Sequence, residues 1–175
     1  IDIPNLITEI TGISNSMVYK SPTEAEIIDD FLNFLGDCPL VAHNIRFDEQ
    51  FLSRLCQRYE KEEYNFKKYD TLQLARSLLF EQPVFNLTAL SDFYGLSSDN
   101  AHRAENDTEN TGFMFLELIK ELAGYPLDFI SKVNALIQGE SIPNFHLYVE
   151  MANALAKKGD LQKGLIKHGI IPNCK

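Results

Sequence analysis

The strongest constraint on how this chain folds is a short apolar run at residues 39–42, which leads directly into an amphipathic helical pattern at 47–60. An apolar run of this length, bounded by turn residues, is typical of a buried strand. The backbone N–H and C=O groups of a buried strand need partners on both edges, so the strand requires neighbours. The sequence therefore predicts a sheet with helices packed against it, and a second short strand is expected at 64–69.

Helical patterns dominate the rest of the sequence. The order Ser21-Pro22-Thr23-Glu24 is that of a helix start with Ser21 as the cap, and an apolar stripe follows it as far as Gly36. Further helices are predicted at 71–79, 86–94, 103–122, 127–137, 145–158 and 161–168. The character of the sequence changes after Pro126. We therefore expect two parts, a main domain at 1–124 and a helical extension, or linker to a further domain, at 125–175.

Acidic residues outnumber basic residues by 25 to 16, which gives a net charge of −9. This charge argues against bulk attraction to nucleic acid or to an anionic membrane. No apolar run approaches the roughly 18 residues of a membrane span. We therefore expect a cytoplasmic protein with no membrane partner. A site in which carboxylates hold divalent cations stays compatible with the charge, because a bound metal reverses the local field.

Asp48 is an unusual acid because it lies on the apolar stripe of its predicted helix. That stripe contains Phe51, Leu52 and Leu55. A carboxylate in such a position needs a partner, since burial of an unpaired charge is costly. Two interpretations stay open, an acid stabilised by the helix N-terminus and a metal ligand.

Asp107 repeats this pattern near the start of the helix predicted at 103–122. The same face of that helix carries Ala104, Thr111, Met114 and Leu118. Two inward acids, each near the start of a helix, could meet over a shared Mg²⁺ or Mn²⁺. His102 precedes Asp107 by five residues, and an exposed imidazole beside metal-bound water could remove a proton near neutral pH.

The basic residues Lys61, Lys67, Lys68 and Arg76 are candidates for contact with a nucleic-acid backbone, and a solvated basic surface is the alternative. Asp70 precedes a predicted helix, where an acid is most often an N-terminal cap or a structural residue. The sequence does not decide whether the basic residues contact a nucleic acid, or whether Asp70 is a cap or another kind of structural residue.

Four segments occur in an order and at spacings that are shared with a known family. They are Thr11-Gly12-Ile13, Val41-Ala42-His43-Asn44-x-x-Phe47-Asp48, Asp70-Thr71-Leu72-x-Leu74-Ala75-Arg76 and Ala101-His102-Arg103-Ala104-x-x-Asp107. Together they resemble the DEDDh 3′→5′ exonucleases, and most closely the proofreading (epsilon-type) subunits of bacterial DNA polymerase III. The resemblance covers roughly residues 1–124.

The resemblance implies an α/β, ribonuclease H-like exonuclease fold in which helices flank a mixed sheet. It implies that Asp48 and Asp107 ligate metal, that His102 is the catalytic general base, and that Asn44 contributes to the substrate site. The implied reaction is hydrolysis of the terminal phosphodiester with two Mg²⁺ or Mn²⁺ ions. The implied partners are single-stranded 3′ ends, DNA in preference to RNA, and a polymerase or helicase in DNA replication or repair.

One part of the family pattern, an Asp-x-Glu on the first strand, does not occur before the Thr11-Gly12 turn. We expect it upstream of Ile1 in a parent protein, together with the first strands of the sheet, which would leave this chain helix-rich and with negligible exonuclease activity. Two alternatives remain. One is a non-catalytic exonuclease-like module that docks a polymerase or helicase, and the other is an RNA-trimming exonuclease of the same superfamily.

Overall fold

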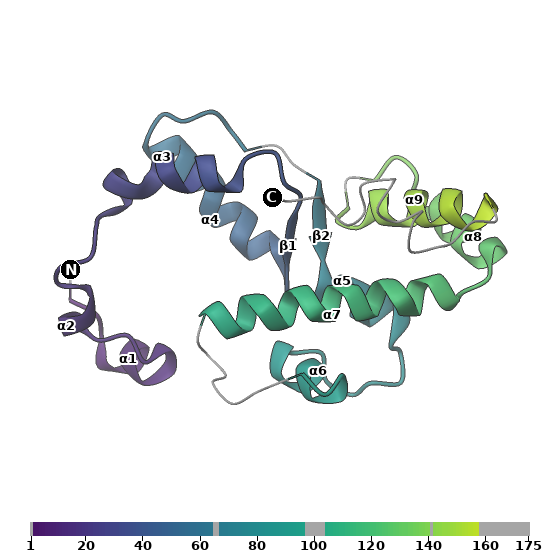
Figure 1. Cartoon of the computed structure of the whole chain (residues 1–175), viewed down its shortest axis with the longest axis horizontal. Helices are drawn as coiled ribbons and strands as arrows, with labels where there is room; N and C mark the ends of the chain where they lie inside the picture. Colours follow the sequence, from purple (N-terminus) through teal and green to yellow (C-terminus); the bar gives the residue numbers. More distant parts are fainter. Residues whose placement is uncertain (1, 65–66, 97–103, 141, 158–175) are drawn as a thin grey trace.

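The structure, a computed structural model, describes residues 2–64, 67–96, 104–140 and 142–157. Within them, two short parallel strands are flanked by helices, and the long helix α7 passes close to one end of both strands (Figure 1). The elements in chain order are α1 (Asn5–Thr11), α2 (Asn15–Val18), α3 (Glu24–Leu35), β1 (Leu40–Ala42), α4 (Ile45–Arg58), β2 (Lys68–Asp70), α5 (Thr71–Leu78), α6 (Leu87–Phe93), α7 (Ala104–Gly124), α8 (Leu127–Ile137) and α9 (Phe145–Ala156). No helix in the described ranges combines the length and the apolar character needed to cross a bilayer.

The sheet is a parallel pair in which Val41 of β1 lies opposite Tyr69 of β2. Helix α4 connects the two strands, so the three elements form one β-α-β unit. The predicted strand is confirmed in position, but the prediction that it is buried is wrong, because all three residues of β1 are only half-buried. The reason is that no other strand in the described part of the chain pairs with the second edge of β1. The predicted mixed sheet stays a prediction.

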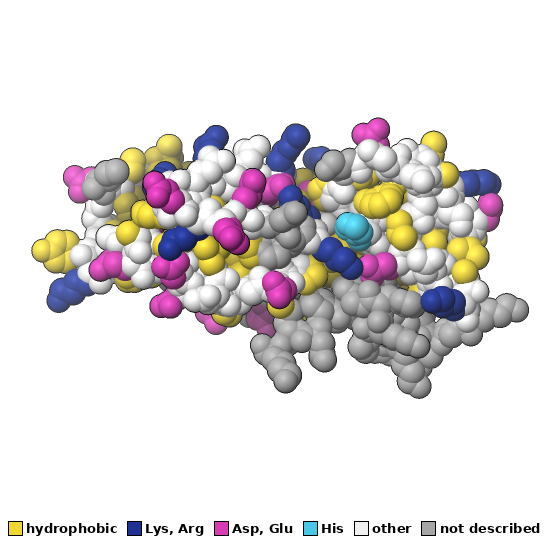
Figure 2. Space-filling view, turned by 90° about the horizontal axis from the view of Figure 1, so that it is seen from above, with side chains coloured by type: hydrophobic (Ala, Val, Ile, Leu, Met, Phe, Trp, Pro, Cys, Tyr) yellow, Lys and Arg dark blue, Asp and Glu magenta, His cyan; other side chains and the backbone are white. Residues whose placement is uncertain are grey.

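The start of α3 differs from the predicted one. The cap is Thr23 and not Ser21, because Glu26 stands three residues after Thr23 and completes the capping box there. The Thr23 backbone N–H and hydroxyl both donate to Glu26 Oε2, at 2.7 and 2.8 Å. An ion pair between Glu24 and Arg58 then holds α3 against α4. Acidic and basic side chains are interspersed over the face of the molecule that Figure 2 shows.

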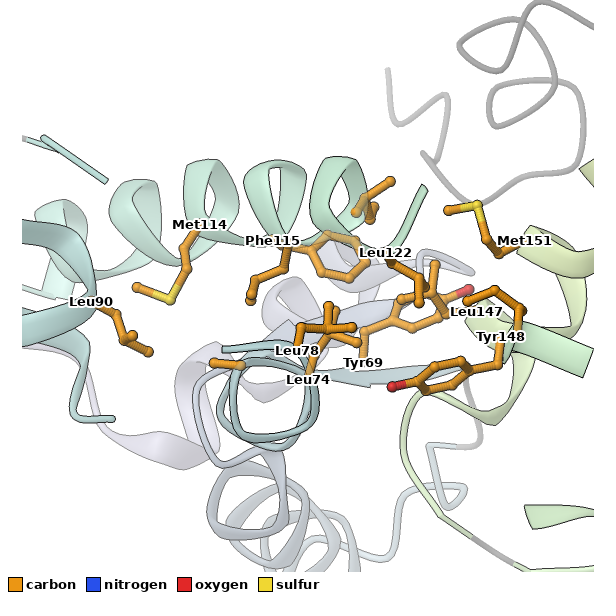
Figure 3. Close-up of a cluster of buried hydrophobic side chains, with 14 residues drawn as sticks. Tyr69, Leu74, Leu78, Leu90, Met114, Phe115, Leu122, Leu147, Tyr148 and Met151 are labelled. Carbon is orange, nitrogen blue, oxygen red and sulfur yellow. The ribbon is translucent and has the colours of Figure 1, made fainter. Parts of the chain in front are cut away.

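The core lies between β2 and helices α5, α7, α8 and α9 (Figure 3). The ring of Tyr69 stacks on that of Phe115, with 5.2 Å between the ring centroids. The buried members of this cluster are Tyr69, Leu74, Ala75, Leu78, Leu90, Met114, Phe115, Leu118, Ile119, Leu122, Ile130, Leu147, Tyr148 and Met151. Residues of α8 and α9 are therefore packed into the same core as the rest. The domain boundary at 124 stays a prediction.

The predicted helices correspond to observed ones, and the helix at 127–137 has the predicted bounds. The helix predicted at 161–168 lies outside the described residues. The short helices α1 and α2 were not predicted, and neither contains a buried residue. Helix α1 carries Leu6, Ile7 and Ile10 at helical spacing, but all three are exposed, and helices of seven and four residues offer too short a pattern to identify a face.

Candidate functional site

Asp48 lies in the first turn of α4 and lines a pocket of about 520 Å³. The walls of this pocket come from α3, β1, α4 and α7, and are mostly apolar. They include Phe31, Leu35, Val41, Phe51 and Leu52. The prediction that Asp48 shares the apolar face of its helix is therefore confirmed, although its side chain also reaches solvent.

The surroundings of Asp48 make its charged form unfavourable. Burial raises the pKa of its carboxyl, hydrogen bonding to its own backbone N–H lowers it, and the nearby charge of Asp70 raises it again. No basic residue in the described ranges forms an ion pair with Asp48. A carboxylate in this situation would be stabilised by a cation brought from outside the protein.

Asp107 is half-buried in the first turn of α7, and its carbonyl accepts a hydrogen bond from Thr111 Oγ1 at 2.7 Å. The next residue, Thr108, lines the Asp48 pocket, but Asp107 itself does not. The structure thus brings the start of α7 to the pocket without placing both carboxylates in it. Among the described residues, no three His, Cys, Asp or Glu side chains gather closely enough to hold a metal ion. His102 lies outside the described residues.

Asn44 stands immediately before α4 in the left-handed conformation, with φ of 73°, which Asn tolerates better than most residues. Its backbone N–H donates to Asp70 Oδ1 at 3.1 Å. The same oxygen accepts from the backbone N–H groups of Leu72 and Gln73, so Asp70 caps α5 as predicted. One buried carboxylate therefore ties the N-termini of α4 and α5 together, and Asn44 stays exposed beside it.

His43 is a residue of the same motif to which the sequence assigned no role. Its Nε2 donates to the Phe85 carbonyl at 2.8 Å, and its Nδ1 lies 3.0 Å from Thr71 Oγ1. Burial lowers its pKa, while the hydrogen bond to Phe85 opposes this change. The lowered pKa favours the neutral imidazole, and Nε2 carries the proton that faces the Phe85 carbonyl. Thr71 Oγ1 lies within hydrogen-bond distance of both Nδ1 and the Ala42 carbonyl. Its position between three segments indicates a structural role.

A second hollow of about 690 Å³ lies on the other side of α4 from Asp48. We call it the basic groove, and it is lined by Asn44, Arg46, Glu49, Lys68, Asp70, Leu72, Gln73, Arg76, Ile142, Pro143 and His146. Of the four basic residues singled out in the sequence, Lys61, Lys67 and Lys68 form ion pairs with Asp29, Glu150 and Glu49. Arg76 is exposed and forms no ion pair with a described residue.

Arg46 is the groove residue that the sequence reasoning missed. It stands between Asn44 and Asp48 in the second motif, and its position there was the only available signal. His146 comes from α9, which lies outside the family motifs, so nothing in the sequence connected it with Arg46 and Arg76.

The comparisons with known proteins agree with one another. Residues 2–115 match the model of a family described as exonuclease. The chain is 34% identical to a PolC-type DNA polymerase III of Latilactobacillus sakei over 128 residues. These matched residues make up 73% of the chain and 9% of that protein. It is 30% identical to the DNA polymerase III subunit epsilon of Aquifex aeolicus over 120 residues. These matched residues make up 69% of the chain and 59% of that protein.

A third relative is the 3′-5′ exonuclease DinG of Bacillus subtilis. The chain is 33% identical to it over 141 residues, which is 78% of the chain and 15% of that protein. The chain thus spans less than two thirds of the length of each of these curated relatives, and only a small part of the PolC-type and DinG proteins.

Proposed function

The chain belongs to the exonuclease family, and from this premise we propose that it takes part in removing nucleotides from the 3′ ends of DNA. The names of its relatives support this reaction, since they include a 3′-5′ exonuclease and a subunit of DNA polymerase III. The order of the motifs around Asp48 and Asp107 supports it as well. The proposed products are nucleoside monophosphates, and the proposed setting is proofreading or repair.

The observation that carries the proposal is the Asp48 carboxylate in its apolar pocket, without a cationic partner among the described residues and with its pKa raised by burial. Such a carboxylate fits Mg²⁺ or Mn²⁺ in donor chemistry, since both ions prefer oxygen ligands. Asp107, next to pocket residue Thr108, is the proposed second ligand. When bound, two such ions would activate water and stabilise the leaving oxygen.

The remaining roles rest on the residues of the chain. His102 is proposed to accept the proton of the attacking water, because an imidazole titrates near neutral pH. Asn44 is proposed to shape the substrate site, and its exposed position at the start of α4 is compatible with that role. The segment 125–175 is proposed as a helical extension or a linker to a further domain, and a polymerase or helicase is a proposed partner of the protein.

These 175 residues on their own are proposed to have negligible activity. They contain two of the four acids of the family pattern, and their described part holds no group of three metal donors. The same observation favours a second candidate, a non-catalytic exonuclease-like module. The two candidates differ in one respect that can be measured, since only the enzyme needs Asp48 and Asp107 as metal ligands.

The test uses the full-length natural protein, a 3′-labelled single strand of DNA and Mn²⁺ titration. Asp48→Asn and Asp107→Asn are expected to lose Mn²⁺ binding and turnover together. His102→Ala is expected to keep Mn²⁺ binding and to lose about 100-fold or more in turnover, as removal of a general base does. Glu109→Gln, on the solvated side of α7, is the matched control and should change neither.

Equal Mn²⁺ affinity of the wild type and Asp107→Asn would contradict the ligand assignment. Absence of Mn²⁺-dependent cleavage by the natural protein would leave the non-catalytic module as the function. Cleavage of an RNA strand in preference to the DNA strand would identify the RNA-trimming alternative.

A further inference from the structure

The basic groove combines side chains from segments that are far apart in the sequence. Arg46 comes from α4, Arg76 from α5 and His146 from α9, and all three are exposed. The carboxylates that share the groove already have partners. Glu49 is paired with Lys68, and Asp70 is buried and accepts three backbone N–H groups. The guanidinium groups of Arg46 and Arg76 are therefore the charges that the described residues leave unpaired.

The helix ends around the groove add to its positive potential. Both α4, with 14 residues, and α9, with 12 residues, begin at it, through Asn44 and through Pro143 and His146. The N-terminus of a helix carries a partial positive charge and free backbone N–H groups. The Asp70 carboxylate already faces the N-terminus of α4, so the N-terminus of α9 and the two unpaired guanidinium groups are what favour an anion with several oxygen acceptors.

The shape of the site favours an extended anion over a compact one. The groove adjoins a hollow of about 840 Å³ along α4, and the two share Arg46, Glu49 and Lys68. Arg54, which lies in that second hollow, is exposed and has no ion-pair partner among the described residues. Arg46 and Arg54 are eight residues apart, which is about 12 Å along a helix axis and several times the ~3.4 Å rise per nucleotide of one strand.

The balance of charge here is opposite to that of the whole chain. The basic residues that line the two hollows are Arg46, Arg54, Lys68 and Arg76, and the acidic ones are Glu49, Glu63 and Asp70. The surplus is positive, whereas the chain carries −9 overall. Figure 2 shows Lys and Arg side chains beside a histidine near the middle of one face. The two hollows are therefore less repulsive to a polyanion than the net charge of the chain would suggest.

We propose that the basic groove binds the sugar–phosphate backbone of a nucleic-acid strand, with Arg46 and Arg76 as the phosphate contacts. The proposal rests on the proposed function and adds a contact surface that is separate from the Asp48 pocket. Backbone contacts of this kind position a strand and carry no sequence information. The groove therefore holds the substrate, and the Asp48 side of α4 is where the strand ends.

The test measures binding without metal, so that it does not depend on cleavage. The 175-residue protein in EDTA is titrated into a 5′-fluorescein single-stranded DNA, and fluorescence anisotropy is recorded at several salt concentrations. Arg46→Gln/Arg76→Gln should weaken binding about tenfold or more and lower the slope of log K against log salt by about 1.4, as expected for two lost phosphate contacts. Lys120→Gln/Lys132→Gln removes the same charge from exposed lysines of α7 and α8, and should leave affinity and slope unchanged.

The proposal is overturned if the arginine variant binds like the wild type, or if both double variants weaken binding equally, because bulk charge would then be responsible. It is also overturned if a polyglutamate peptide of equal length competes as well as the DNA does, because the groove would then be a site for acidic peptides. Failure of the proposed function shows itself separately, as absence of Mn²⁺-dependent cleavage together with an unchanged binding result.

Discussion

Replacement of Asn144 by alanine should destabilise the fold strongly, although it truncates a single uncharged side chain. Asn144 is 1% exposed and precedes α9, yet it serves as the neighbouring strand of β2. Its backbone N–H donates to the Lys68 carbonyl at 3.1 Å. Its side-chain Oδ1 accepts from the Asp70 N–H at 2.9 Å, and its Nδ2 donates to the Asp70 carbonyl at 3.0 Å.

The magnitude follows from the groups that lose their partners. Asn144→Ala leaves the N–H and the C=O of Asp70, a buried residue, without these hydrogen bonds. Each unsatisfied buried group costs about 1–3 kcal/mol, so the loss should be about 2–6 kcal/mol. Asn144 also has φ of 68°. Alanine adopts this conformation only at a cost in free energy, whereas glycine adopts it without that cost. Asn144→Gly should therefore be about 1 kcal/mol more stable than Asn144→Ala.

The assay is urea unfolding followed by circular dichroism, with the free energy of unfolding compared among wild type, Asn144→Ala and Asn144→Gly. Asn134→Ala is a suitable control, because it removes one side-chain hydrogen bond to the Tyr148 carbonyl on the neighbouring helix and leaves β2 untouched. The role of Asn144 at the edge of β2 is refuted if the free energy of unfolding of Asn144→Ala lies within about 0.5 kcal/mol of the wild-type value, as it does for ordinary surface substitutions. If Asn144→Ala is more stable than Asn144→Gly, the positive φ at position 144 does not contribute to stability as argued.

Three further predictions concern pH, the Asp48 pocket and the start of α3. Burial lowers the folded-state pKa of His43 below its unfolded value of ~6.5, so the unfolded chain binds more protons and stability falls as the pH drops below ~6.5. The free energy of unfolding, measured with urea at pH 5.5 and 7.5, should therefore fall less between these two pH values in His43→Gln than in the wild type. An equal fall in both proteins would contradict this prediction. Because the folded-state pKa of Asp48 is raised, its charge destabilises the fold above that pKa, and Asp48→Asn should raise the Tm at pH 7 by an amount that shrinks in acid. A lower Tm at pH 7 would contradict this. Thr23→Ala should cost about 0.5–2 kcal/mol of unfolding free energy, and Ser21→Ala, which removes the cap that the sequence suggested, should cost much less. The reverse order would favour Ser21 as the cap.

The sequence was sufficient for several features that depend on neighbours within a few residues, although it placed the cap of α3 at Ser21 instead of Thr23. The apolar run at Leu40–Ala42 and the helix that follows it lie where their spacing predicted, and Asp70 caps α5 as its position before Thr71 indicated. The family was also within reach, because four ordered motifs are far more specific than one. The match of residues 2–115 to the exonuclease family confirms that resemblance.

Other features that the sequence did not reveal depend on contacts between distant segments. Asn144 is 74 residues away from Asp70 in the sequence, and no local pattern predicts that an asparagine before a helix will complete the edge of a sheet. Burial of β1 was mispredicted for a related reason, since burial depends on what lies at the second edge of the strand. The proposed pair of metal ligands presents the same difficulty, because helical spacing places Asp107 on an inward face and does not fix its distance from Asp48.

Helix α4 is the element that relates the two candidate regions to each other. Arg46 and Asp48 are two residues apart, which is about 200° around a helix, so they face opposite sides. The Asp48 side is an apolar pocket that disfavours charge, and the Arg46 side is a groove with unpaired cations. The N-terminus of α4, where Asn44 is exposed and lines the groove, lies between the Arg46 side and the Asp48 side in the sequence. The positive φ of Asn44 turns the chain from β1 into α4 and directs its backbone N–H to Asp70 Oδ1. The proposed backbone contacts and the proposed metal ligand would thus be carried by opposite faces of one helix.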